Sequence, residues 1–174
     1  MARLLPGTDP IHKVTIIPRG RSLGLTQQLP IVEKHTYTKD DMQNNICILM
    51  GGRAAEEIML NTRTTGAEND IEKASDLARK MVCEYGMSEE LGPLAFGKKE
   101  GQIFLGRALT QHRDYSEMTA QRIDEEVRNI VIGSYKKAAK LIKDNLDTLH
   151  KMTKALLEKE TLNSREIYEL MTGG

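Results

Sequence analysis

One carboxylate, that of Asp70, stands where a helix would turn it toward a protein core. A helix over 65–85, drawn at about 100° per residue, carries an apolar stripe that includes Leu77 and Met81, and Asp70 lies at the edge of this stripe. A carboxylate withdrawn from water destabilises a fold unless a cation or hydrogen-bond donors meet it. The pattern therefore leaves two interpretations of Asp70: a structural ion pair or helix cap, and a metal ligand.

A second set of charged residues lies in the preceding predicted helix. Arg53, Glu56 and Glu57 fall within its apolar arc, and Ile48 and Met59 make its opposite side apolar too, which indicates a buried helix. Arg53 lies one turn before the glutamates and is their nearest partner. We expect desolvation to raise the pKa of Glu56 unless Arg53 or water compensates. The set either fixes helix packing or belongs to a metal site.

The motifs of a self-contained enzyme are missing from the sequence. No His-Glu-x-x-His occurs, although a catalytic zinc normally needs three protein ligands, and the histidines are scattered at positions 12, 35, 112 and 150. A phosphate-binding Gly-x-x-x-x-Gly-Lys-Ser/Thr loop is absent as well. Taken alone, the residues do not contain a complete active site.

The composition excludes several classes of partner. The 174 residues include 25 basic and 25 acidic side chains, balanced in both halves, so the chain lacks the basic excess that binding nucleic acid demands, and 4% aromatics leave little to stack on bases. No apolar run is long enough to span a membrane and no signal peptide is evident, so we expect a soluble chain. Cys47 and Cys83 are expected to be reduced thiols rather than a disulfide, as in a reducing compartment.

The periodicity of apolar residues predicts a mainly α fold with a small β-sheet near the N-terminus. Strands at 13–17 and 22–28 flank turn residues and would form a hairpin, and two apolar segments at 93–97 and 102–105 would form another. The strand at 22–28 suits an exposed edge, where an extended polypeptide could pair, or else is an ordinary edge strand without a ligand.

Capping signals delimit the predicted helices. Three capping pairs precede helical patterns: Thr38 with Asp41 for 38–61, Thr65 with Glu68 for 65–85, and Asn163 with Glu166 for the last helix. Ser116 is a single N-cap for a helix that ends near 145. A further amphipathic helix is predicted over 146–157. We interpret 1–174 as a single domain, in which 1–112 holds the candidate metal-site and substrate-strand residues and 113–174 is a C-terminal helical region.

Several runs of residues identify a family. The sequence resembles the proteolytic domain of the FtsH family of membrane-anchored ATP-dependent zinc proteases at 5–10 (Leu-Pro-Gly-Thr-Asp-Pro), 12–20 (His-Lys-Val-Thr-Ile-Ile-Pro-Arg-Gly), 23–26 (Leu-Gly-Leu-Thr), 51–58 (Gly-Gly-Arg-Ala-Ala-Glu-Glu-Ile), 64–70 (Thr-Thr-Gly-Ala-Glu-Asn-Asp), 84–88 (Glu-Tyr-Gly-Met-Ser), 91–94 (Leu-Gly-Pro-Leu) and 104–107 (Phe-Leu-Gly-Arg). The resemblance covers residues 4–171 in order, and implies an FtsH protease-domain-like helical fold.

The resemblance also implies roles for single residues. In the family a His-Glu-x-x-His helix supplies two zinc ligands and the general base, and the Asp at the position of Asp70 is the third ligand. Glu56 resembles the residue that orients a ligand, with Arg53 and Glu57 beside it. Apart from the resemblance, the predicted edge strand at 22–28 holds the candidate substrate-strand residues Leu23, Gly24, Leu25 and Thr26.

For the intact parent, the resemblance implies degradation of unfolded or damaged membrane and cytosolic proteins. Polypeptide would be unfolded with ATP and Mg²⁺ and threaded into a hexameric chamber that holds zinc. The parent would be anchored in the bacterial inner membrane, or an organelle equivalent, with this domain on the cytoplasmic side. This chain would meet a membrane only through N-terminal segments that it lacks.

The sequence departs from the family pattern at its start. Met1, Ala2 and Arg3 stand where the family has the His-Glu-x-x-His helix, so Met1 looks like a fragment boundary or the start of a naturally shortened paralogue. We therefore expect an inactive protease-domain remnant that binds no zinc at the family site. The alternative is a non-catalytic helical oligomerisation or interaction module derived from the same family.

Overall fold

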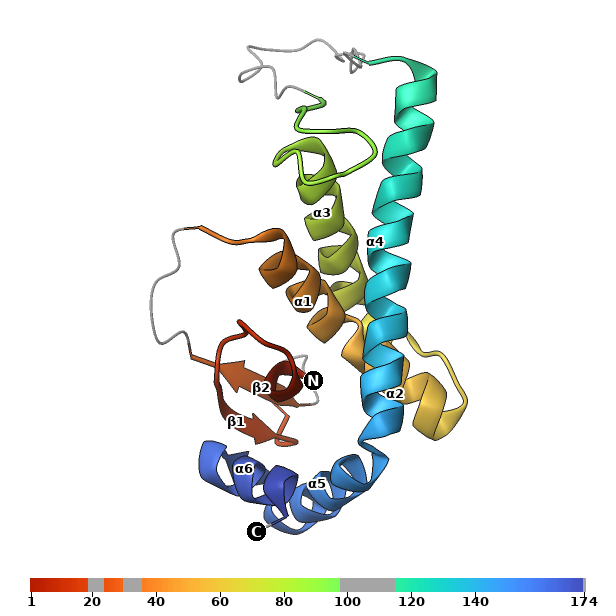
Figure 1. Ribbon diagram of the computed structural model, residues 1–174. Helices are drawn as coiled ribbons and strands as arrows, with labels where there is room; N and C mark the ends of the chain where they lie inside the picture. Colours follow the sequence, from red (N-terminus) through yellow and green to blue (C-terminus); the bar gives the residue numbers. More distant parts are fainter. Residues whose placement is uncertain (19–23, 30–35, 98–114, 174) are drawn as a thin grey trace, which may run out of the picture.

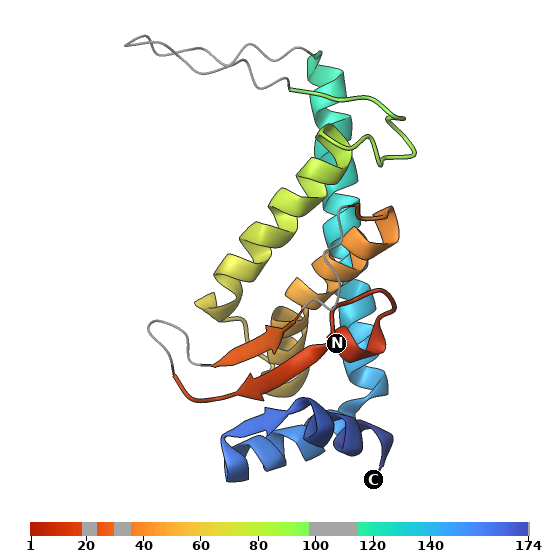
Figure 2. The same cartoon turned by 90° about the vertical axis from the view of Figure 1, so that its left-hand side faces the viewer.

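The computed structural model is mainly helical with one small sheet, as the sequence predicts, and it describes residues 1–18, 24–29, 36–97 and 115–173. Helix α4 (Glu117–Asp144) runs along most of the molecule, and α1 (Lys39–Leu49), α2 (Gly51–Leu60) and α3 (Glu68–Cys83) pack beside it (Figure 1). The sheet lies between these helices and the pair α5 (Leu146–Lys159) and α6 (Ser164–Thr172) (Figure 2). A 3-10 helix, η1 (Ala2–Leu4), begins the chain.

The predicted single helix over 38–61 is wrong, because the chain bends at Met50. The Thr38–Asp41 capping box is confirmed, but α1 ends at Leu49 and α2 begins at Gly51. Two consecutive glycines, which are poor helix formers, follow the bend. A Cβ on Gly51 would lie 3.0 Å from Cγ of Met1, so the glycine lets the N-terminal residue approach the bend.

The helix that carries Asp70 begins with a tighter turn than predicted. Residues Thr65–Ala67 form the 3-10 helix η2, and α3 starts at Glu68. The capping hydroxyl is that of Thr64, which accepts from the N–H of Gly66, rather than that of Thr65. After α3, Gly86 takes the left-handed conformation (φ +59°) that the sequence predicts for the end of this helix.

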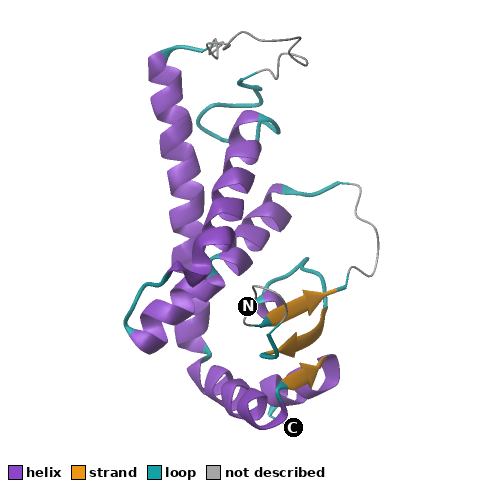
Figure 3. Cartoon of the chain, turned by 180° about the vertical axis from the view of Figure 1, so that it is seen from behind, coloured by secondary structure: helices purple, strands orange, loops and turns teal. Residues whose placement is uncertain are grey.

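The sheet has a strand that the sequence did not reveal. Strands β1 (Ile11–Thr15) and β2 (Leu25–Gln28) form the predicted antiparallel hairpin, and β3 (Thr161–Asn163) pairs antiparallel with the other side of β1. The order is therefore β2-β1-β3, which leaves β2 at an edge of the described sheet (Figure 3). The pairing of β1 with β3 joins residues near the two ends of the chain.

The second predicted hairpin is not formed in the part of the chain that the structure describes. Residues 93–97 run as bends and coil without a strand, and 102–105 lie outside the described residues. Pro93 packs close to Gly86, where an added Cβ would lie 2.9 Å from Cα of Pro93. The segment therefore closes over the end of α3 instead of pairing.

The C-terminal helices follow the predicted caps. Ser116 accepts from the N–H of Thr119 at the start of α4, and the Asn163–Glu166 capping box begins α6. The core lies where α1, α3 and α4 meet and includes Ile46, Cys47, Met81, Val82 and Ile123. Cys47 and Cys83 are both free thiols, as expected.

Candidate functional site

Asp70 lies in the first turn of α3, on the side of the helix that faces the core. Ala67, one turn before it, and Ala74, one turn after it, are both buried, whereas Asp70 is half-buried. The predicted place at the edge of the apolar stripe is thus the observed one. Across residues 1–18, 24–29, 36–97 and 115–173, no hydrogen bond or ion pair reaches the Asp70 carboxylate. The first turn of a helix favours a negative charge there.

Glu56 is held by the loop that leads from α2 to α3. Its Oε1 accepts from the hydroxyl of Thr64, and its Oε2 accepts from the N–H of Thr64 at 3.3 Å and from Nη1 of Arg53 at 3.2 Å. Arg53 also donates from Nη2 to the carbonyl of Thr64 at 3.1 Å. Both oxygens of Glu56 are therefore engaged by groups that tie α2 to Thr64.

The expectation of a raised pKa at Glu56 is wrong. The hydrogen bonds from Thr64, hydroxyl first and backbone N–H second, hold the pKa of Glu56 below its ordinary value and outweigh desolvation, while Arg53 adds a smaller lowering. The side chain of Glu56 keeps 21% of its surface exposed, so desolvation is modest. The sequence named Arg53 as the group that would offset the desolvation of Glu56, whereas Thr64 supplies most of the stabilisation of its charged form.

Glu57 has different partners from its neighbour. Its Oε1 accepts from Nε of Arg63 at 2.8 Å, and its Oε2 accepts from the hydroxyl of Tyr135 on α4 at 2.6 Å. These bonds, Tyr135 first, lower the pKa of Glu57, and the same contact raises the pKa of Tyr135. The sequence pointed to Arg53 as the partner of Glu57 and missed both Arg63 and Tyr135.

The expected burial of α2 on both sides is also wrong. Ala54 is fully buried against the core, but Met59 is 37% and Leu60 is 68% exposed. The helix packs on α4 along one side and ends at Leu60, and the capping residue Asn61 adopts a left-handed conformation (φ 47°). Arg53, Glu56 and Glu57 therefore lie at the margin of the core and not inside it.

The residues that the structure describes do not make a metal site by themselves. In these ranges no group of three His, Cys, Asp or Glu side chains converges as a metal would require. Asp70 is the only zinc ligand that the family resemblance assigns to this sequence. The donors within the described ranges do not by themselves fit a zinc ion, so a site that includes Asp70 would need further ligands from outside those ranges.

The candidate substrate strand is an edge strand. Leu25 and Thr26 are exposed on β2, whereas Leu23 lies outside the described residues. Gly24 precedes the strand at a close approach, because a Cβ there would lie 2.9 Å from the carbonyl oxygen of Thr15 on β1. The glycine therefore lets the hairpin close tightly where the strand begins.

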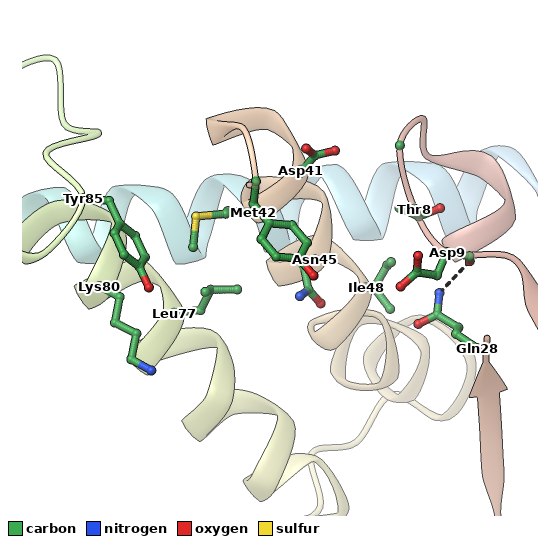
Figure 4. Close-up of a pocket in the computed structure, with 12 residues that line it drawn as sticks. Thr8, Asp9, Gln28, Asp41, Met42, Asn45, Ile48, Leu77, Lys80 and Tyr85 are labelled. Carbon is green, nitrogen blue, oxygen red and sulfur yellow. Dashed lines mark hydrogen bonds between the residues drawn. The ribbon is translucent and has the colours of Figure 1, made fainter. Parts of the chain in front are cut away.

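A cavity of about 300 Å³ adjoins the other end of β2. Figure 4 shows Gln28 of β2 and the backbone near Thr8 and Asp9 on one side, and side chains of α1 and α3 on the other. Gln28 donates from Nε2 to the carbonyl of Asp9 at 3.1 Å. Asp70 does not line this cavity, although Leu77, two turns farther along α3, does. The cavity thus extends from β2 toward the helix that bears Asp70.

None of the helices in the described part of the chain combines the length and the hydropathy that crossing a bilayer requires.

Comparison with known proteins identifies the family. The sequence matches the model of Peptidase family M41 over residues 1–170. It is 57% identical to the ATP-dependent zinc metalloprotease FtsH of Magnetococcus marinus over 173 residues, which are 99% of this chain and 26% of that protein. Proteins of the same name from Acidobacterium capsulatum and Myxococcus xanthus are 57% and 52% identical over 99% and 100% of the chain, and 27% of each relative is covered. The chain thus spans about a quarter of these relatives' length. Because the match extends over nearly all of its residues, the chain belongs to peptidase family M41 and has the sequence of an FtsH-type protease domain.

Proposed function

We propose that this chain is part of the peptidase domain of a membrane-anchored ATP-dependent zinc metalloprotease that degrades unfolded or damaged proteins. The observation that carries the proposal is the 57% identity, over 99% of the chain, to a relative that bears this name. Hexameric assembly, use of ATP and Mg²⁺, and anchoring in a bacterial inner membrane with this domain on the cytoplasmic side belong to the same proposal.

Within that enzyme, Asp70 is a zinc ligand. Three observations support this role: the carboxylate lies on the core-facing side of α3, it is half-buried, and no cation of the described residues neutralises it. An ion pair or cap, the other interpretation of Asp70, would require a partner that those residues do not provide. The remaining ligands and the general base lie in residues that this sequence does not include.

Glu56 supports the site without being a ligand. Each of its oxygens already accepts a hydrogen bond, and Arg53 neutralises its charge. A carboxylate so engaged would have to break these bonds to coordinate a metal. Glu56 and Arg53 instead fix Thr64, six residues before Asp70, and thereby fix the entry into α3.

The chain by itself does not cleave polypeptides. Its 174 residues contain no His-Glu-x-x-His, and the described part offers no substitute cluster of ligands. Activity therefore depends on residues that the intact parent would supply.

Extended substrate pairs with the exposed edge of β2 in the intact enzyme. The edge position, the exposure of Leu25 and Thr26, and the cavity beyond Gln28 support this mode of binding. In the intact parent, Leu25→Pro should weaken cleavage of an unfolded substrate far more than it lowers the melting temperature. Equal losses in the two measurements would reduce β2 to an ordinary edge strand.

The proposal is tested by Asp70→Asn in the intact parent, where the change keeps the shape of the side chain and removes its charge. We expect the variant to lose bound zinc and proteolysis while ATP hydrolysis persists. Asp76→Asn is the matched control, because Asp76 is exposed on the same helix. Wild-type zinc content and proteolysis in Asp70→Asn would contradict the assignment.

A helical oligomerisation module is the second candidate function. Helix α5 favours it, because none of its 14 residues is buried and Leu157 is 72% exposed. Such a helix is available for contact with another copy of the chain.

A further inference from the structure

The seven residues between α2 and α3, Asn61–Ala67, are held at two adjacent points. Glu56 binds the backbone and hydroxyl of Thr64, and Glu57 binds the guanidinium of Arg63. Two neighbouring carboxylates on α2 therefore bind two neighbouring residues of this segment. Because the segment leads directly into α3, its position sets where the first turn of that helix lies.

The contact between Glu57 and Arg63 is connected to α4 through Tyr135. Tyr135 donates its hydroxyl to Oε2 of Glu57 at 2.6 Å, while Arg63 donates from Nε to Oε1 at 2.8 Å and makes a longer contact from Nη2 to Oε2 at 3.5 Å. Tyr135 is half-buried where α2 packs on α4, and it lies 78 residues from Glu57 in the sequence. The side chain of Arg63 is 75% exposed, so the shorter bond from the half-buried Tyr135 is the contact that ties Glu57 to the core helices.

We propose that Tyr135 is a positioning residue that acts through Glu57 and Arg63 on segment Asn61–Ala67, and thereby on the carboxylate of Asp70. The importance of Asp70 in this inference rests on the proposed function. The chain of contacts runs from α4 through α2 to the segment. It makes the long C-terminal helix part of the support of the candidate metal-site region.

The hydroxyl of Tyr135 can be removed without disturbing its ring. Tyr135→Phe leaves the packing between α2 and α4 in place but leaves Glu57 Oε2 without this donor. Hydrogen bonds to charged acceptors are among the stronger ones, so the segment should open more often. We expect amide hydrogen exchange of residues 63–67 in this chain to become about tenfold faster, with unchanged exchange in α5 and α6.

Tyr168→Phe is the matched control. Tyr168 lies on α6 with its ring 4.9 Å from the guanidinium carbon of Arg3, a contact that Phe retains. This variant should leave exchange in residues 63–67 unchanged. A second variant, Glu57→Gln, tests the route: adding Tyr135→Phe to it should accelerate exchange less than in the wild-type background, because the two residues act through one contact.

Two results would overturn the inference. Exchange of residues 63–67 in Tyr135→Phe within twofold of wild type would show that the segment does not depend on the hydroxyl. Equal acceleration in every helix would show a general loss of stability and no positioning.

A kinetic experiment on the intact parent tests the effect on the site. Tyr135→Phe should lower the turnover number for peptide cleavage more than it raises KM, and an unchanged turnover number would contradict a positioning role toward Asp70. Wild-type activity of Asp70→Asn would instead remove the proposed function and leave the exchange experiment valid.

Discussion

Thr64 donates both its hydroxyl and its backbone N–H to the carboxylate of Glu56, eight residues earlier in the chain. This double contact joins the last turns of α2 to the entry of α3. It also explains why a glutamate in a largely apolar arc remains ionised. The contact therefore has a measurable dependence on pH.

Glu56 should stabilise the fold at neutral pH and lose this effect in acid. Because its pKa in the folded state lies below the ordinary value of 4.5, the contribution is present above that value and disappears as pH falls through the lower, folded-state pKa. The difference in unfolding free energy between wild type and Glu56→Gln should thus shrink between pH 7 and about pH 3. Urea unfolding at several pH values measures it. Glu72→Gln, on an exposed position of α3, should show no such trend, and a difference for Glu56→Gln that grows in acid would contradict the assignment.

Two glycine substitutions should have opposite effects. Gly24→Ala places a Cβ 2.9 Å from the carbonyl oxygen of Thr15 and should destabilise by about 1–3 kcal/mol, because backbone must move. Gly133→Ala lies on an exposed position inside α4 with no atom within 4 Å of the new Cβ, and should stabilise by about 0.5–1 kcal/mol. Thermal and urea unfolding of both variants compare the two. Equal shifts of the same sign would argue against the close approach at Gly24.

Leu162 tests whether β3 is an integral part of the fold. The side chain is fully buried, and Leu162→Ala should cost about 2–5 kcal/mol in unfolding free energy. Leu157→Ala is the matched control, because that leucine is 72% exposed and its loss should change stability by at most about 0.5 kcal/mol. A loss at position 162 as small as that at position 157 would mean that β3 does not pack as described.

The chain should associate with itself through α5. A formal net charge of zero gives little repulsion between copies, and α5 presents Leu157 on a helix without buried residues. Light scattering on a dilution series should show oligomers that Leu157→Glu weakens. A strict monomer at high concentration would contradict this expectation.

Signals that are local in the sequence predicted the local structure. Caps at Thr38, Ser116 and Asn163 stand where expected, since each needs only residues three positions away. The bend at Met50 was missed because apolar periodicity continues through it. Strand β3 was missed because a run of three residues is too short to show an alternating pattern. Its pairing with β1 also joins residues from opposite ends of the chain, which no local signal indicates.

The candidate site divides in the same way. The helical period placed Asp70 on the inner side of α3, and the placement is observed. Contacts across larger separations were not readable, so Thr64 and Tyr135, rather than Arg53, proved to be the main partners of Glu56 and Glu57. Nothing in the sequence indicates which acceptor the hydroxyl of Tyr135 or that of Thr64 will bind.

Metal content and cleavage of the purified chain test the central claim most directly, which is that this sequence holds one ligand of an M41 zinc site and not the whole site. The chain would be prepared without chelators, its zinc measured by mass spectrometry, and its action on unfolded casein followed with and without a chelator. We predict far less than one zinc per chain, no chelator-sensitive cleavage, and no change in either on Asp70→Asn. One zinc per chain that Asp70→Asn releases, together with cleavage that a chelator abolishes, would contradict the claim.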